Sequence, residues 1–219
     1  MQKHAITIVH ASPASIAPLN NYYPKAEPAL EITNLFDDGV MRLFRKDRHE
    51  IAKQRLADMI ATGRELYDAE VALLACSAVT SESMRDLRAN SRIPLVKIDE
   101  PMARLAVQTG SRIGVIVTFP PTQSVTRNLL EEAADGKQLQ VVEELVPEAL
   151  EALIAGDQPT HDKLMTSAAE RLAEQQVDAI VLAQVSMANL VGPLKERTGL
   201  PVFSSLETSL VEVRRVLGI

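Results

Sequence analysis

The single cysteine, Cys76, has the residue type and position best suited to proton transfer or nucleophilic attack. It follows VALLA, a run typical of a buried strand, and precedes SAVTSESMRDL, which we interpret as a helix that begins with Ser and Thr caps. The backbone dipoles at a helix N-terminus lower the pKa of a thiol and make it a better base or nucleophile. The alternative is a free cysteine that packs as a small apolar side chain. The strand-end position favours a functional role, and Ser77 and Thr80, which follow Cys76, are candidates for binding the substrate.

Polar residues at the other strand ends suit an anionic ligand. Ser12, Thr118 and Thr122 can donate hydroxyl hydrogen bonds, and backbone N–H groups of the loops ASPAS and TFPPT can cradle a carboxylate. The alternative is that these Ser and Thr residues only cap helices. Neither GxGxxG nor GxxxxGK[ST] occurs, so the sequence does not favour a dinucleotide or a nucleoside triphosphate.

His161 and Asp99 are two further acid–base candidates. His161, beside Asp162 in GDQPTHDKLM, is either a group that titrates near pH 7 or an ordinary residue of a helix's first turn. Asp99, in KIDEPM, either lines the site or caps a turn. We expect no metal, because there is one cysteine and the four histidines lack zinc-binding spacing.

Short apolar runs alternate with amphipathic stretches along the whole chain. The predicted strands cover residues 5–10, 31–36, 71–77, 94–99, 112–118, 140–146, 178–184 and 201–205, and helices are expected over 47–66 and from about 147 to 175. Unbroken apolar runs that alternate with helices predict an α/β fold with parallel sheets. Ligands of such sheets bind at the carboxyl ends of the strands.

The chain repeats itself in spacing and in local sequence. His10 and Cys76 are 66 residues apart, and so are Thr118 and Gln184. DAEVALLACSAV matches VDAIVLAQVSMA, IPLVKIDEPMA matches LPVFSSLETSL, and HASPAS matches TFPPTQ. We therefore predict an α/β protein of two pseudo-symmetric, doubly wound parallel-sheet half-domains with the site between them. The first half is 1–103 plus 206–219, and the second is 104–205.

These twin halves, with LLACSAVT, VLAQVSMA and TFPPT, resemble the aspartate/glutamate/hydantoin racemase superfamily over essentially the whole chain. The resemblance implies no cofactor, a homo-oligomer (a dimer or higher), and one cysteine on each face of the substrate's α-carbon. Cys76 matches the first of these cysteines, but Gln184 replaces the second. A carboxamide does not ionise near neutral pH, so we expect Gln184, with Ser186 beside it, to bind substrate and not to transfer a proton.

The resulting prediction is a cofactor-independent isomerase of the racemase or epimerase type. It acts at the α-carbon of a small carboxylate or carbonyl compound, with Cys76 as acid or base and His161 or Asp99 as the unlike partner. Ser12, Ser77, Thr118 and Thr122 donate to the enediolate oxygens. One alternative is a one-thiol lyase such as a decarboxylase. Another is a ligand-binding protein that has lost catalysis.

Composition excludes several other classes of protein. The 219 residues are 46% hydrophobic and 24% charged, which is ordinary for a globular chain. The net charge is −6, and basic residues cluster only in short pieces such as RKDRH, so no nucleic-acid partner is expected. No apolar run approaches the ~20 residues that span a bilayer. We therefore expect no membrane partner and a cytoplasmic location.

Overall fold

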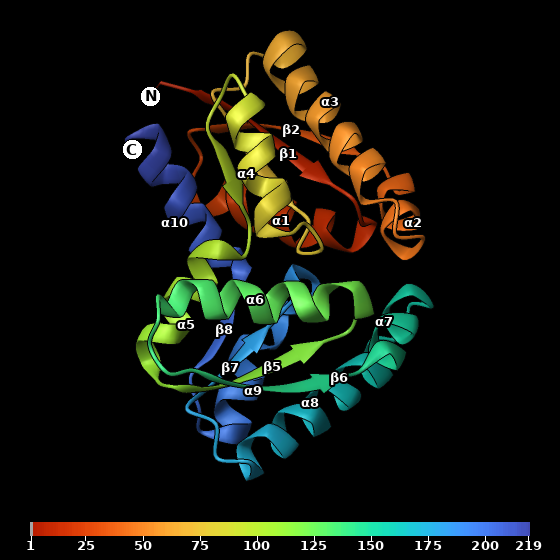
Figure 1. Cartoon of the computed structure of the whole chain (residues 1–219), viewed down its shortest axis with the longest axis vertical. Coiled ribbons are helices and arrows are strands. Elements are labelled where there is room, and N and C mark those ends of the chain that lie inside the picture. The colour runs from red at the N-terminus through yellow and green to blue at the C-terminus, as the bar shows by residue number, and fades with distance from the viewer. Residues whose placement is uncertain (1) are drawn as a thin grey trace. The chain divides into compact units, whose positions relative to one another are not determined.

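The computed structural model describes residues 2–219, so Met1, the first residue of the first predicted half, lies outside the described residues. The chain divides into two compact units. Unit 1 comprises Met1–Ile98 and Leu206–Ile219, and unit 2 comprises Asp99–Ser205. Each unit contains one four-stranded parallel sheet with helices on both faces, which confirms the predicted α/β class (Figure 1).

Unit 1 has the strand order β2-β1-β3-β4, and all its pairs are parallel. Its elements are β1 (His4–His10), the 3-10 turn η1 (Pro13–Ser15), α1 (Ile16–Ala26), β2 (Leu30–Phe36), α2 (Gly39–Arg45), α3 (His49–Tyr67), β3 (Val71–Ala75), α4 (Ser81–Asn90), β4 (Leu95–Lys97) and α10 (Ser205–Leu217). Every residue of β3 is buried, as expected for a strand that is covered on both faces.

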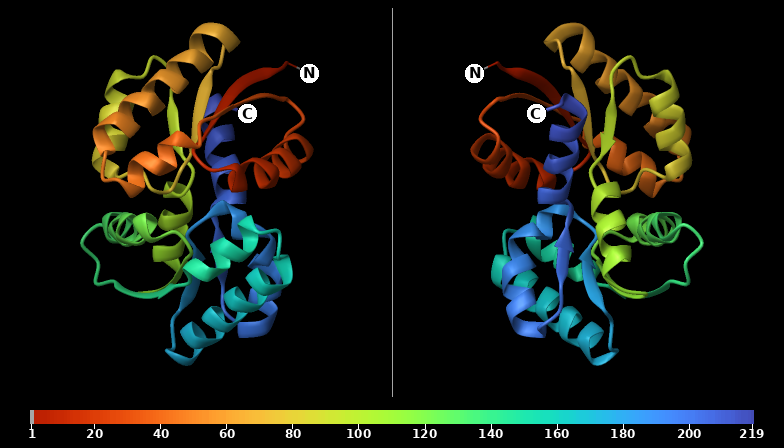
Figure 2. Two further views of the ribbon diagram at one scale, coloured as in Figure 1. Left: turned by 90° about the vertical axis from the view of Figure 1, so that its right-hand side faces the viewer. Right: turned by 90° about the vertical axis from the view of Figure 1, so that its left-hand side faces the viewer.

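The helices of unit 1 pack on opposite faces of its sheet, as the two views of Figure 2 show. On one face, the Tyr23 hydroxyl of α1 lies 2.8 Å from the Ser209 hydroxyl of α10. On the other face, α3 approaches β1 so closely that a Cβ added at Gly63 would overlap the side chain of Thr7. Glycine is required at this point by the close packing of helix and strand.

Unit 2 has the order β6-β5-β7-β8, which repeats the arrangement of unit 1. Its elements are α5 (Glu100–Thr109), β5 (Arg112–Val117), the 3-10 turn η2 (Pro120–Thr122), α6 (Gln123–Ala134), β6 (Gln140–Leu145), α7 (Pro147–Ile154), α8 (Gln158–Glu174), β7 (Ala179–Leu182), the 3-10 turn η3 (Val185–Leu190), α9 (Val191–Thr198) and β8 (Val202–Ser204). The predicted runs that contain Cys76 and Gln184 extend two residues beyond β3 and β7, so both residues lie just after their strands.

The core of unit 2 shows which way the strand residues face. Odd-numbered residues of β5 and β7, such as Val115 and Val181, pack with α5 and α6. Even-numbered residues, such as Ile116 and Leu182, pack with α8, η3 and α9. Successive side chains of a strand point to opposite faces, so the alternation separates two apolar layers. Within residues 2–219, no helix is long and apolar enough to cross a membrane.

Candidate active site

The carboxyl ends of β5 and β7 place two predicted site residues in direct contact. Ile116 of β5 lies beside Leu182 of β7 in the parallel register, and Thr118 and Gln184 each follow two residues later. The Gln184 Oε1 atom accepts a 3.0 Å hydrogen bond from the Thr118 main-chain N–H and another of 3.0 Å from the Thr118 hydroxyl. Thr118 is buried and Gln184 is half-buried.

These bonds determine the orientation of the Gln184 carboxamide. A main-chain N–H can only donate, so the oxygen of the amide, and not its nitrogen, must face Thr118. The Nε2 atom is buried and has no hydrogen-bond partner among residues 2–219. A buried donor without an acceptor costs about 1–3 kcal/mol. A ligand oxygen would satisfy this amide, and a carboxylate oxygen would do so most strongly.

His161 is another group of unit 2 with an unused polar atom. Its side chain is 1% exposed, and Nδ1 lies 2.8 Å from the Asp162 carboxylate. The Gln158 Nε2 atom lies 3.2 Å from Nδ1 and donates to the same Asp162 oxygen at 2.7 Å. Because the carboxylate can only accept, we assign the proton to Nδ1, and a neutral ring then keeps its lone pair on Nε2. Nε2 is buried without a hydrogen-bond partner in the described part of the chain. The ring can therefore accept a proton at Nε2 while Asp162 holds its orientation.

The topology places His161 at the carboxyl edge of the unit 2 sheet. Helix α8 leads into the start of β7, so its first turn lies near the opposite, carboxyl edge of the parallel strands. His161 precedes Met165 by one turn, and Met165 packs with Met187 on the layer formed by even-numbered strand residues. His161 therefore lies on the same face of the sheet as Gln184.

Cys76 follows the fully buried strand β3 and is itself 5% exposed. The predicted helix with a Ser or Thr cap forms as α4, but it begins at Ser81, so Cys76 does not lie at the helix N-terminus as expected. A turn separates Cys76 from the helix, and helix-dipole effects fade within the first turn.

Thr80 is the N-cap: its hydroxyl accepts from the Ser83 N–H at 3.1 Å and donates to the Ser83 hydroxyl at 3.1 Å. These bonds favour the capping role of Thr80 over substrate binding, whereas the half-buried Ser77 hydroxyl makes no hydrogen bond within residues 2–219.

The end of β1 carries a polar network that sequence reasoning did not single out as functional. The fully buried His10 ring contacts the Ser15 hydroxyl through Nδ1 at 2.7 Å and Asn34 through Nε2 at 2.9 Å. Burial lowers the pKa of His10 below 6.5, and the hydrogen bond with Asn34 opposes this only partly. The Ser15 hydroxyl donates to the Ser12 carbonyl at 2.8 Å, so the contact between the His10 ring and Ser15 helps to hold the Ser12 loop. The signal for His10 was its place as the last residue of a buried strand.

Three other predicted residues also occupy the ends of strands or the turns after them. Asp99 is fully buried at the N-cap of α5, where its carbonyl accepts from the Ala103 N–H at 3.0 Å. Thr122 is buried at the end of η2, and Ser186 is half-buried in η3. No group of three or more His, Cys, Asp or Glu side chains in the described residues could hold a metal ion.

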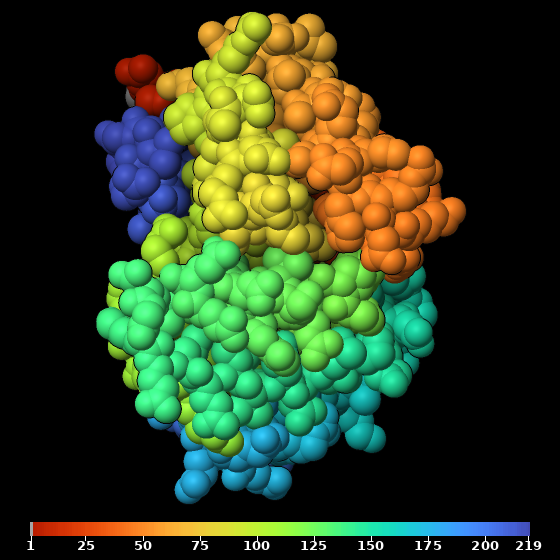
Figure 3. Space-filling model, in the orientation of Figure 1, coloured from red at the N-terminus to blue at the C-terminus, as the bar shows by residue number. Residues whose placement is uncertain are grey.

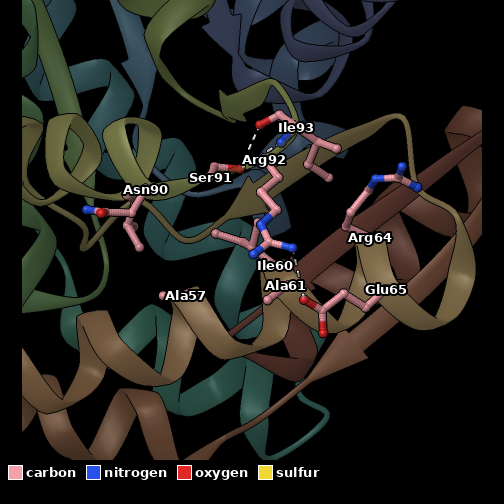
Figure 4. Close-up of a pocket in the computed structure, with 10 residues that line it drawn as sticks. Ala57, Ile60, Ala61, Arg64, Glu65, Asn90, Ser91, Arg92 and Ile93 are labelled. Atoms are coloured by element: carbon pink, nitrogen blue, oxygen red, sulfur yellow. Dashed lines mark hydrogen bonds and ion pairs between the residues drawn. The ribbon is translucent and has the colours of Figure 1, made fainter.

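Figure 4 shows a cavity of unit 1 that lies away from the strand-end residues. It encloses about 210 Å³ between the C-terminal halves of α3 and α4. Arg92, which reaches Glu65 at 4.0 Å, and the aliphatic side chains of Ile60 and Ile93 line it. Both helices end here and lead into the starts of β3 and β4, so the cavity lies at the amino edge of the sheet, away from the strand-end residues.

Comparison with solved structures identifies the fold. Glutamate racemase RacE1 from Bacillus anthracis superposes with a TM-score of 0.77 at 17% identity, over 100% of this chain and 83% of that chain. Allantoin racemase from Klebsiella pneumoniae gives 0.73 at 21% identity, over 99% and 89%. The aspartate racemase homologue PH1733 from Pyrococcus horikoshii gives 0.70 at 17% identity, over 100% of both chains. Two units, each with a parallel four-stranded sheet and polar strand ends, thus define a protein of the racemase-like α/β fold.

The family follows from the sequence. The profile of the Asp/Glu/hydantoin racemase family matches residues 32–213. The chain therefore belongs to the Asp/Glu/hydantoin racemase family, which supports an isomerase function of the racemase type. A segment of 81 residues is also 30% identical to part of soluble guanylate cyclase 89Da of Drosophila melanogaster. This segment covers 36% of this chain but only 11% of the cyclase.

Proposed function

We propose that this protein is a cofactor-independent racemase or epimerase that inverts the α-carbon of a small carboxylate compound. The observation that carries the proposal is the Gln184 carboxamide. Its oxygen is held by Thr118, and its buried amide hydrogens have no acceptor within residues 2–219. A carboxylate is the ligand that best satisfies such a donor, and the donor remains available as the carboxylate becomes an enediolate.

Cys76 is proposed as one of the two proton-transferring groups. Inversion requires a base that removes the α-proton from one face and an acid that delivers a proton to the other. A carboxamide does neither, so Gln184 binds and a different side chain must supply the second group. His161 suits this role, because Asp162 holds the proton on Nδ1 and leaves Nε2 able to accept one. Thr118, Thr122, Ser12 and Ser77 are proposed as hydroxyl donors to the substrate oxygens.

Proton NMR in D₂O tests the proposal with a panel of amino acids, hydantoins, hydroxy acids, sugar acids and substituted malonates. We expect α-proton exchange together with loss of optical activity for at least one class of compound. Exchange with retained chirality, or loss of a carboxylate, would contradict racemisation and favour the one-thiol lyase. No reaction with any compound would favour a binding protein without catalysis.

Variants that lack one of the two proton-transferring side chains then identify the role of each. Cys76→Ser should lower racemisation by about 10²–10⁴-fold, the usual contribution of a general acid–base group. It should exchange the α-proton of one enantiomer only, and His161→Gln should exchange that of the other. His49→Gln, at a half-exposed histidine of unit 1, is the matched control and should change neither rate. If Cys76→Ser racemises normally while it remains folded, Cys76 is not the acid or base.

A further inference from the structure

A cavity lined by basic side chains lies at the corner between α2 and α3 in unit 1, outside the set of strand-end residues described above. It is open to solvent and has a volume of about 400 Å³. Four cationic residues line it, Arg42, Lys46, Arg48 and Arg55, against one acidic residue, Asp37. The corner is drawn in orange and forms part of the surface visible in Figure 3.

Local ion pairs neutralise half of these cations. The Arg55 Nε atom donates to Asp37 at 2.6 Å, and Arg42 donates to Asp38 at 2.6 Å. The bond from the Arg55 guanidinium is the main reason that the pKa of Asp37 is lowered, so this carboxylate remains charged and paired. Neither carboxylate is therefore available to neutralise a further cation.

Lys46 and Arg48 are left with unused donors. The side chains of both are exposed, and neither makes a hydrogen bond or ion pair within residues 2–219. The turn that carries them is nonetheless firmly built. Asp47 adopts the left-handed conformation with φ of 52°, and the Arg48 N–H donates to the Leu43 carbonyl at 3.0 Å. The backbone thus presents both cations to the cavity before any ligand arrives.

The charge of this corner is opposite to that of the rest of the chain. Residues 37–55 contain six Lys and Arg against four Asp and Glu, a net charge of +2, whereas the remaining residues together carry −8. An acidic protein repels anions over most of its surface, so a local basic cavity concentrates them at one place. Two unpaired cations match a ligand with two negative charges.

We propose that the α2–α3 cavity binds a small organic dianion, either a dicarboxylate or a phosphate ester. Lys46 and Arg48 supply charge-assisted hydrogen bonds, and the planar Arg48 guanidinium can hold two oxygens of one anionic group. The cavity lies beyond the carboxyl end of β2, where the Asp37 N–H donates to the His10 carbonyl at 3.1 Å, and its lining includes none of the residues assigned to chemistry. The inference therefore does not rest on the proposed racemase activity.

Backbone amide NMR titrations of the full-length protein test this site with succinate, inorganic phosphate, acetate and succinamide. We expect saturable shifts at residues 37–55 with succinate, phosphate or both, and weaker or no response to the monoanion and the neutral diamide. A response to one dianion only identifies which class of ligand the cavity takes. The variant Lys46→Gln/Arg48→Gln should weaken binding by about tenfold or more, since it removes two charge-assisted hydrogen bonds.

The control variant Lys25→Gln/Lys137→Gln removes the same charge from exposed lysines elsewhere and should bind as the wild type does. Cys76→Ser should also bind normally, which separates this site from the proposed reaction. Absence of saturable binding to the wild type would overturn the proposal. Equal binding by the Lys46/Arg48 and Lys25/Lys137 variants, or equal shifts with succinamide, would overturn it too.

Discussion

Replacement of Gln184 by glutamate is the sharpest test of whether the Gln184 carboxamide binds the substrate carboxylate. The introduced carboxylate can still accept from the Thr118 N–H and hydroxyl, which both donate at 3.0 Å to the oxygen of Gln184. The change therefore preserves the bonds that hold the side chain. It removes only the two buried amide hydrogens that have no acceptor in the described residues, and it adds a negative charge.

The magnitude follows from the two interactions that change. A hydrogen bond to a charged partner contributes about 1.5–3 kcal/mol. Two like charges about 4 Å apart repel by about 4 kcal/mol at an effective dielectric constant of about 20. The introduced carboxyl can take up a proton and relieve part of this repulsion. We therefore expect Gln184→Glu to raise the KM for a carboxylate substrate by about 100-fold or more, which corresponds to about 2.7 kcal/mol.

Initial rates of racemisation give KM and kcat for the wild type and the variant over a pH series. The rise in KM should shrink as the pH falls, because protonation of the introduced carboxyl removes its charge. Gln175→Glu, at an exposed position of the same unit, makes the same charge change and should leave KM within about twofold. Urea unfolding of Gln184→Glu should resemble that of the wild type, since both Thr118 bonds remain possible.

Two results would refute the reasoning. If Gln184→Glu lowers kcat with KM unchanged, the side chain acts on the transition state and does not bind the ground-state carboxylate. If neither constant changes, the unpaired amide hydrogens do not face the substrate.

Three further predictions concern the stability of the two units. Gly63→Ala should destabilise unit 1 by about 1–3 kcal/mol, since its Cβ overlaps Thr7, and Thr7→Ala should restore much of the loss in urea unfolding. Burial lowers the pKa of His10 below 6.5, so as the pH falls the ring is protonated in the unfolded state before it is protonated in the folded state. The free energy of unfolding should therefore fall as the pH drops below about 6.5, and it should fall less in His10→Gln. Asp178→Ala should cost about 1–2 kcal/mol, because its carboxylate accepts at 2.8 Å from two consecutive N–H groups at the start of β5, whereas Asp178→Asn should cost less.

Each of these stability predictions has a clear contrary outcome. Additive effects of Gly63→Ala and Thr7→Ala would show that the two positions do not compete for space. An identical pH dependence in the wild type and His10→Gln would show that this ring does not contribute to acid sensitivity. Equal stability of the Ala and Asn variants of Asp178 would show that the side-chain oxygen makes no net contribution.

The α/β class and the repeated arrangement could be predicted because they depend on local and periodic features. Unbroken apolar runs such as 71–77 and 112–118 predict strands covered on both faces, and each of the eight predicted runs overlaps a strand. The equal spacing of 66 residues in the two halves corresponds to the same strand order in both sheets. The helix with a Ser or Thr cap after Cys76 was predicted correctly, but the thiol does not lie at its N-terminus, because a Ser/Thr-rich stretch can form a turn or a cap equally well and Thr80 is the residue that caps.

The chemistry of the strand ends required the tertiary structure. The sequence by itself determined that position 184 carries a carboxamide that cannot ionise, and that His161 lies beside a carboxylate. Only the parallel pairing of β5 and β7 brings Thr118, 66 residues away, onto the oxygen of Gln184 and so leaves its amide hydrogens without an acceptor in the described chain. Burial of the His161 Nε2 atom likewise depends on how α8 packs against its sheet. Residue type determines which hydrogen bonds a group can make, but long-range packing decides which of them remain available for a ligand.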